Sequence, residues 1–153
     1  MNRALAFAPG EYYHVYHRGH NKRDIFLDER DRWRYLSLLY VANSDKTIHL
    51  SDLWRQPTIE IFNVPRGSHL TKIGCYCLMP NHVHLLVREH RQNGISLFMQ
   101  KLSTGYSMYF NKKYQRTGSL FESTFKAQHV DGDPYLHYLL AYLHLNPVKT
   151  MNP

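Results

Sequence analysis

Cysteine is scarce in this 153-residue chain, which has only two. Cys75 and Cys77 are separated by one residue on an expected strand, too close for an ordinary disulfide, so a disulfide-stabilised fold is excluded. Free thiols are typical of a reducing compartment. The N-terminal residues also lack the apolar stretch of a secretory signal peptide. We therefore expect a cytoplasmic protein.

Long apolar runs and acidic residues are also in short supply. No stretch of about 18 apolar residues occurs, so we expect no membrane-spanning helix and no membrane partner. The 12 acidic residues are outnumbered by 19 lysines and arginines, which gives a net charge of +7 with histidines neutral. This balance favours a polyanionic partner, and nucleic acid is the better candidate. Aromatic residues, in contrast, are plentiful at 14% and can build a hydrophobic core.

The hydrophobic pattern predicts four strands and three helices in the order β-α-β-β-α-β-α. One helix begins after Asp28, the next spans residues 95–110, and the last begins at Asp133 and ends at Pro147. This order is typical of a ferredoxin-like α+β fold with one antiparallel sheet and an added C-terminal helix. Two helices should cover one face of the sheet and the last helix the other. The expected strands are residues 12–17, 71–78, 83–88 and 125–130.

The periodicity fades between residues 43 and 68, where Pro57, Pro65 and Gly67 punctuate the chain. We interpret this segment as an insertion in a single domain that spans residues 1–153. Within it, residues 59–64 predict a short strand.

Two histidines flank one valine within the expected strand at residues 83–88 and the turn before it. Alternate side chains of a strand share a face, so His82 and His84 project together, away from the apolar residues between and after them. Their Cα atoms lie roughly 7 Å apart in such a strand, so both imidazoles can reach one ion. Two imidazoles in an apolar strand are costly to bury without partners, which predicts a bound ligand.

The last expected helix places Tyr142 and Asn146 one turn apart. If the apolar side of the histidine strand faces the first two helices, the histidines face this helix. A tyrosine oxygen is a competent nucleophile toward a phosphate, and a divalent ion offsets the charge that develops during in-line displacement. His82, His84 and Asn146 are therefore candidate metal ligands, and Tyr142 is a candidate nucleophile.

Each of these signals also has a structural interpretation. Histidine pairs are often structural, Tyr142 is one of 12 tyrosines, and Asn146 before Pro147 is a common helix-ending pair. Cys75 and Cys77 with the histidines suggest zinc, but their spacing is short for a zinc site. Buried strand cysteines are the better account of that pair.

A series of short motifs follows one another along nearly the whole chain outside residues 43–68. They include Tyr-His-Val and Arg-Gly near the N-terminus, Met-Pro-Asn-His-Val-His-Leu-Leu in the middle and Tyr-Leu-His-Leu-Asn-Pro near the end. In this order they resemble the single-tyrosine HUH transposases, especially the REP-associated tyrosine transposases. The motifs occupy residues 13–19, 76–86, 98–102, 109–111, 118–121 and 142–147.

The resemblance implies a nuclease domain that acts on single-stranded DNA carrying hairpins, as a monomer or homodimer. His82 and His84 match the metal-binding histidines of the family, Asn146 matches its third ligand, and the ion would be Mg²⁺ or Mn²⁺. Tyr142 matches the nucleophile, which would form a 5′-phosphotyrosyl link and release a 3′-hydroxyl. Residues 58–64 would add a strand or a flap that contacts DNA.

The basic side chains of the chain agree with a DNA substrate, because phosphate contacts hold a strand in register. Two other functions remain open. One is a non-catalytic, domesticated DNA hairpin-binding protein, and the other is a metal-dependent hydrolase whose tyrosine is structural. A covalent protein–DNA adduct separates the transposase from both. The candidate DNA-binding residues are Arg18, Lys22, Arg23, Lys101, Lys112, Lys113, Arg116 and Lys126.

Overall fold

The computed structural model describes residues 5–53 and 58–151 and, within these, the side chains of residues 5–52 and 60–145. Its elements follow the predicted order, with three short 3₁₀ helices added. Strand and helix ends differ from the predicted ones by one or two residues, apart from the ends of the last two helices. In chain order the elements are β1 (Tyr12–Arg18), η1 (His20–Lys22), α1 (Glu29–Val41), η2 (Leu50–Leu53), η3 (Thr58–Asn63), β2 (Thr71–Met79), β3 (His82–Glu89), α2 (Gly94–Lys113), β4 (Lys126–Val130) and α3 (Asp133–Met151).

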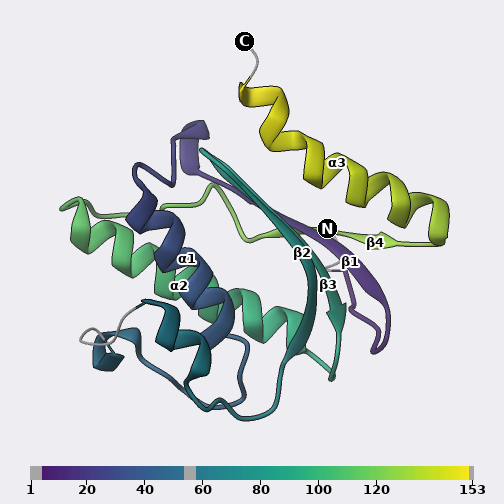
Figure 1. The fold of residues 1–153 in the computed structure, drawn as a ribbon, viewed down its shortest axis with the longest axis horizontal. Coiled ribbons are helices and arrows are strands. Elements are labelled where there is room, and N and C mark those ends of the chain that lie inside the picture. Colours follow the sequence, from purple (N-terminus) through teal and green to yellow (C-terminus); the bar gives the residue numbers. More distant parts are fainter. Residues whose placement is uncertain (1–4, 54–57, 152–153) are drawn as a thin grey trace.

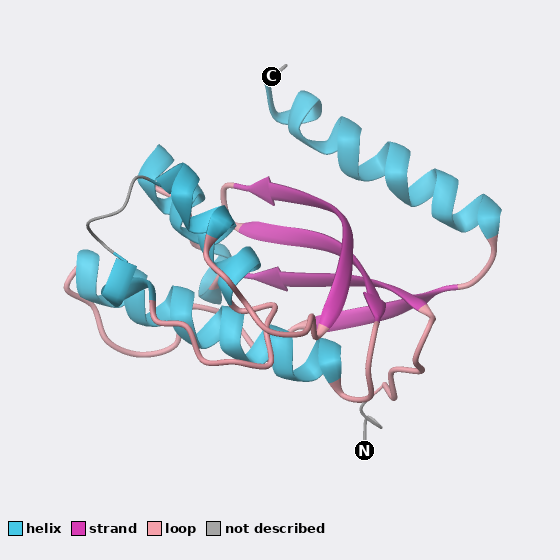
Figure 2. Ribbon diagram, turned by 60° about the horizontal axis from the view of Figure 1, so that its bottom comes forward, coloured by secondary structure: helices cyan, strands magenta, loops and turns pink. Residues whose placement is uncertain are grey.

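The four strands form one antiparallel sheet in the order β2-β3-β1-β4. Figure 1 shows α1 and α2 on one face of this sheet and α3 on the other, and Figure 2 shows the same layers from another side. This arrangement is the predicted ferredoxin-like α+β fold with its added C-terminal helix. The sheet therefore has a helical face, toward α1 and α2, and an α3 face.

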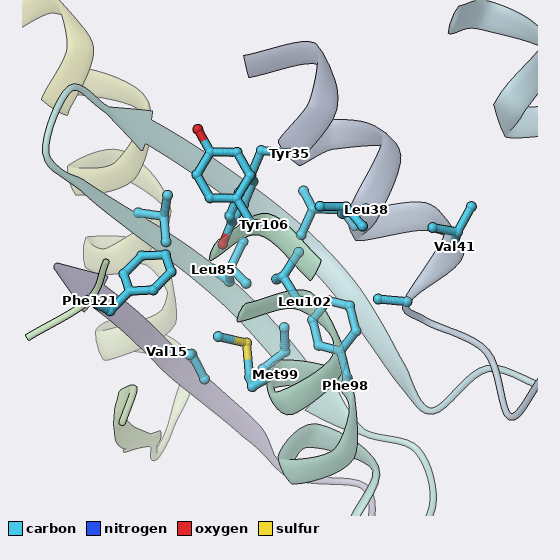
Figure 3. Close-up of a cluster of buried hydrophobic side chains, with 14 of the residues drawn as sticks. Val15, Tyr35, Leu38, Val41, Leu85, Phe98, Met99, Leu102, Tyr106 and Phe121 are labelled. Carbon is cyan, nitrogen blue, oxygen red and sulfur yellow. The ribbon is translucent and has the colours of Figure 1, made fainter. Parts of the chain in front are cut away.

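The helical face carries the main hydrophobic core. Val15 of β1 and Leu85 of β3 are fully buried there, against Phe98 and Leu102 of α2. Figure 3 shows these side chains interlocking between the sheet and the two helices. Burial of apolar side chains on this scale provides the main stabilisation of the fold.

The α3 face carries a second, smaller core. Cys77 and Met79 of β2 and Leu86 of β3 pack against Leu139 and Leu143 of α3. Both cysteines are free thiols, and among the described residues no group of three or more His, Cys, Asp or Glu side chains is arranged to hold a metal. Cys77 is buried in this second core, and the half-buried Cys75 packs against it.

A buried carboxylate ties the start of α1 to the end of α2. Asp28 caps α1 as predicted, and Asp31 closes a capping box with it. Asp31 has no exposed surface and accepts hydrogen bonds from Lys113, Tyr109 and Tyr114 of the α2 end. Burial alone would raise the pKa of Asp31, but these hydrogen bonds lower it to about 2. This carboxylate is buried and fully paired.

The predicted strand at residues 59–64 is wrong. Residues 58–63 form the 3₁₀ helix η3, which packs on α1 rather than on a sheet edge. Ile61 is buried in the main core, and the Tyr40 hydroxyl donates to the Val64 carbonyl. The apolar residues of this segment therefore contribute to the main core without pairing with a strand.

The predicted end of the last helix is also wrong. Helix α3 continues past Pro147 to Met151. A proline removes one backbone donor from a helix and weakens it locally. The hydrogen bonds of the other residues remain available, so the helix extends beyond the Asn-Pro pair.

Candidate active site

The site forms on the α3 face, where the two central strands lie side by side. The register of β1 and β3 pairs Tyr16 with His84 and Arg18 with His82. Because side chains alternate along each strand, these four residues share one face of the sheet. The fully buried Val83 lies on the helical face. The prediction that the histidines face the last helix is confirmed.

The two predicted histidines lie together. Their ring centroids are 4.8 Å apart and the rings are nearly perpendicular. The Nδ1 of His82 lies 2.7 Å from Oδ1 of Asn81, which can only accept, so the ring donates from Nδ1 and keeps a lone pair on Nε2. Burial and the charge of Arg18 lower the pKa of His82. The neutral ring that results at physiological pH is the form that binds metal.

His84 is more deeply buried than His82, and its exposed fraction is 7%. Burial, followed by the neighbouring rings of His82 and His14, lowers the pKa of His84 to about 4. Its Nε2 is one of the few buried side-chain nitrogen or oxygen atoms in the described part of the chain that has no hydrogen-bond partner. A buried polar atom without a partner is costly unless a ligand completes it.

A third histidine, which the sequence reasoning did not assign to the site, lies beside this pair. Nε2 of His14 lies 2.9 Å from Nδ1 of His84. Both side chains are buried. In the sequence, His14 alternates with Tyr16 and Arg18 along β1, which puts the three on one face of the strand. Only the pairing of β1 with β3 shows that this face carries His84.

Helix α3 brings Tyr142 to the histidines. Its ring is half-buried and stands nearly perpendicular to that of His84, with the centroids 5.9 Å apart. The exposed ring of Tyr138 stacks along Tyr142 at 6.2 Å. Leu139 and Leu143 anchor the same helix to the sheet, which fixes the height of Tyr142 above it. The structure thus unites the predicted nucleophile with the predicted histidines.

Asn146 lies one turn after Tyr142 on the same helix. Its side chain is outside the described part of the structure. The role of Asn146 as third ligand therefore stays a prediction.

His82, His84 and Tyr142 border a cavity of about 260 Å³. Glu122 is a second residue that the sequence reasoning did not assign, and Nε of Arg18 donates to its carboxylate at 3.3 Å. The cavity combines imidazole nitrogens, two phenols, a carboxylate and two cationic side chains. Its lining residues are Tyr16, His17, Arg18, His82, His84, Glu122, Ser123, Thr124, Lys126 and Tyr142.

The candidate DNA-binding residues fall into separate groups. Arg18 and Lys126 line the cavity. Lys22 and Arg23 are exposed at and just after η1, and the charge of Arg23 lowers the pKa of Arg116, although burial lowers it more. The charge effect places Arg23 near Arg116, and Lys22 directly precedes Arg23 in the chain.

The remaining candidates lie on α2, on the helical side of the sheet. Nζ of Lys101 donates to the carbonyls of Ser44 and Lys46, and Lys113 pairs with the buried carboxylate described above. Lys112 is exposed. The ammonium groups of Lys101 and Lys113 thus already have partners within the fold, whereas a DNA role for any of these residues stays a prediction.

The cavity residues fit a divalent ion. Among the described residues the buried Nε2 of His84 has no hydrogen-bond partner, and His82, on the same face of β3, has a second nitrogen lone pair on its Nε2. Two imidazoles with oxygen donors nearby suit ions that prefer mixed nitrogen and oxygen ligands. Sites of this kind leave positions for water or substrate oxygens, as catalytic ions require.

Comparison with known proteins decides the family. The family model described as IS200-like transposase matches residues 10–146. The chain belongs to the IS200-like transposases. This membership confirms the resemblance that the motifs suggested, and it makes the protein a DNA transposase by family. A comparison with curated proteins gave no match.

Solved structures agree with the fold of this transposase. A REP-associated tyrosine transposase bound to a REP hairpin superposes with a TM-score of 0.62 at 13% identity, over 98% of this chain and 74% of the other. A Deinococcus radiodurans R1 protein assigned as a transposase gives 0.51 at 13% identity, over 94% and 96% of the two chains. Within the described residues, no helix of the transposase is long and apolar enough to span a membrane.

Proposed function

We propose that this transposase cleaves and rejoins hairpin-bearing single-stranded DNA by transesterification at Tyr142. One observation carries the proposal: the rings of His84 and Tyr142 lie side by side at a cavity that His82 also lines, and the buried Nε2 of His84 has no hydrogen-bond partner among the described residues. A packing tyrosine and two structural histidines would have no need of a cavity lined by charged side chains such as Arg18 and Lys126. Attack of a tyrosine on a phosphate requires the nucleophile and the phosphate-binding groups to lie at one place.

The reaction follows from the position of the phenol. The oxygen of Tyr142 loses its proton and attacks the scissile phosphorus, so a 5′-phosphotyrosyl bond forms while the bond to the 3′ oxygen breaks. The leaving 3′ oxygen takes up a proton and becomes a hydroxyl. That hydroxyl, or another one, can attack the phosphotyrosine in the reverse direction, which rejoins a strand and restores the phenol.

Other side chains of the cavity would hold the substrate. Arg18 and Lys126 border the cavity, where their charges favour a backbone phosphate. His82, His84 and Asn146 would hold a Mg²⁺ or Mn²⁺ ion, which supplies positive charge to the phosphate oxygens when bound. Leu139 and Leu143, which pack α3 onto the sheet, then keep the phenol beside this centre.

A hairpin partner is supported from two sides. The similar solved structure contains a REP hairpin. In this chain, Lys22 and Arg23 are exposed around η1, and Arg23 lies close enough to Arg116, just after α2, for its charge to act on that side chain, so the three residues form a positive region. Such a region suits the phosphates of a DNA duplex stem, while the cavity takes the unpaired strand.

The test is Tyr142→Phe, which removes one oxygen and keeps the ring. The variant and the wild type are incubated with hairpin-bearing single-stranded DNA and Mg²⁺ or Mn²⁺, then separated on a denaturing gel. We expect the wild type to give a cleaved strand and a covalent adduct, and Tyr142→Phe to give neither while binding the DNA unchanged.

Tyr138→Phe and Tyr135→Phe are the matched controls, because they lie on the same helix and should retain both products. Binding by the wild type without cleavage would identify a hairpin-binding protein. Cleavage without an adduct would identify a hydrolase, and an adduct in Tyr142→Phe would identify another tyrosine as nucleophile.

A further inference from the structure

The hydrogen bond between His14 and His84 has a chemical consequence for the metal-binding nitrogen. The two ring nitrogens that share it lie 2.9 Å apart, so one proton lies between them. Burial disfavours a charged ring at either position, since both side chains are less than a tenth exposed. Only two arrangements of a neutral pair are possible.

In the first arrangement, Nδ1–H of His84 donates to Nε2 of His14. The lone pair of His84 then lies on Nε2, the buried atom for which the described residues supply no hydrogen-bond partner. In the second arrangement, His14 donates, so His84 carries its proton on Nε2. That N–H would be a buried donor without an acceptor, and it would block metal binding.

We propose that His14 is a positioning residue that holds His84 in the tautomer able to bind metal through Nε2. This inference rests on the proposed function for the role of the metal, but the tautomer itself is a property of the metal-free protein. His82 offers a parallel within the same site, because Asn81 accepts from its Nδ1 and likewise leaves Nε2 with the lone pair. Each histidine of the pair thus has its own acceptor, and such partners fix ring orientation and ligand basicity.

The place of His14 in the fold suits this role. It lies on β1, one of the two central strands, directly across from Leu86 and diagonal to His84. Its ring also contacts that of Tyr16 at 5.3 Å, which limits its rotation. His14 is therefore held by the rigid centre of the sheet rather than by a loop.

The first measurement is the ¹⁵N NMR spectrum of the histidine rings in the metal-free wild-type protein. We expect His84 to be protonated at Nδ1 and unprotonated at Nε2, with His14 protonated at Nδ1. A His84 ring protonated at Nε2 overturns the proposal whatever the activity of the enzyme.

The second measurement is the affinity of the protein for Mn²⁺ without DNA, which is monitored by the electron paramagnetic resonance signal of the free ion. His14→Phe removes the acceptor and keeps a ring of similar size, so we expect Mn²⁺ affinity to fall by about 10-fold or more. His14→Gln can place an amide oxygen near the former Nε2, so it should restore most of the affinity and the wild-type tautomer.

His129→Phe is the matched control, because it changes an exposed histidine on β4 that pairs with Glu11 and does not contact His84. Unchanged Mn²⁺ affinity and an unchanged His84 tautomer in His14→Phe overturn the proposal. If His14→Phe does not fold, the wild-type spectrum and His14→Gln still decide it. Failure of the proposed function is separate, since a wild type with the expected tautomer but no DNA cleavage would refute only the reaction.

Discussion

Asp31 and His84 are both buried polar side chains, but they lie on opposite sides of the sheet and differ in their partners. Asp31, on the helical side, accepts hydrogen bonds from Lys113, Tyr109 and Tyr114. His84, on the α3 face, has one partner at Nδ1 and, within the described part of the chain, none at Nε2. A fully paired buried group stabilises the fold, whereas a buried group left without a partner is available to a ligand.

The packing of the two faces differs in the same way. The helical face is filled by large apolar side chains from the sheet, α1 and α2, whereas the α3 face combines a small apolar cluster with a cavity lined by titratable and charged side chains. One helix, α3, therefore covers only part of its face. The uncovered part is where chemistry can take place without weakening the main core.

The largest expected effect comes from removing both histidines of the cavity. In the double variant His82→Ala/His84→Ala, cleavage of hairpin-bearing single-stranded DNA should fall by at least about 1000-fold, because the charge stabilisation of the phosphate is lost. DNA affinity should change little, since basic side chains provide most of it. Cleavage gels and fluorescence anisotropy measure the two quantities, and a fully active double variant would refute the site.

Core substitutions on the two faces should differ in what they damage. Leu85→Ala opens a cavity in the main core and should lower the free energy of unfolding by about 3 kcal/mol. Leu139→Ala loosens only α3 and should cost about 2 kcal/mol or less. It should nevertheless reduce cleavage strongly, because α3 carries Tyr142. Urea denaturation and cleavage rates check this, and equal activity losses in the two variants would contradict it.

Acid should weaken the helical side through Asp31. Its pKa is about 2 in the folded protein against 3.8 for an ordinary aspartate, so its stabilisation of about 2 kcal/mol is fully present above pH 4. As the pH falls from about 4 to 2, Asp31 binds a proton more readily in the unfolded state than in the folded state. The stabilisation by this carboxylate is therefore lost over this range. Urea denaturation of the wild type and Asp31→Asn should converge in free energy over this range. A constant difference down to pH 2 would contradict the assignment.

The smallest expected effects concern single DNA-contacting charges. Lys126→Ala should weaken DNA binding modestly and reduce the slope of log affinity against log salt by about 1, as expected for one phosphate contact. Lys101→Ala is the comparison on the helical side, where the ammonium is held by two carbonyls, and it should change the slope less. Salt titrations of DNA binding measure both slopes. A larger slope change for Lys101→Ala than for Lys126→Ala would mean that the DNA contacts the helical side of the sheet and not the cavity.

The regular part of this molecule follows from short-range patterns in its sequence. Alternation placed His82 and His84 on one face of β3, and the element order predicted the sheet with helices on both faces. The family resemblance then supplied the role of Tyr142, which spacing alone could not distinguish from that of other tyrosines.

The missing parts depend on contacts between distant segments. His14 and His84 are 70 positions apart and Asp31 and Tyr114 are 83 apart, so no local pattern reveals either pair. The apolar residues within 58–63 suit a strand, but this segment packs on α1 and not on an edge of the sheet. Tertiary packing thus overrides local preference in the insertion, as it does where α3 continues past Pro147.

The contrast between the two buried polar groups can be tested most directly by measuring unfolding free energy and cleavage rate for both Asp31→Asn and His84→Ala. We predict that Asp31→Asn lowers the unfolding free energy by about 2 kcal/mol and keeps cleavage in conditions where it is folded. His84→Ala should change stability by about 1 kcal/mol or less and lose cleavage. If His84→Ala unfolds the protein while Asp31→Asn leaves it stable but inactive, the assignment of one side to the fold and the other to chemistry is wrong.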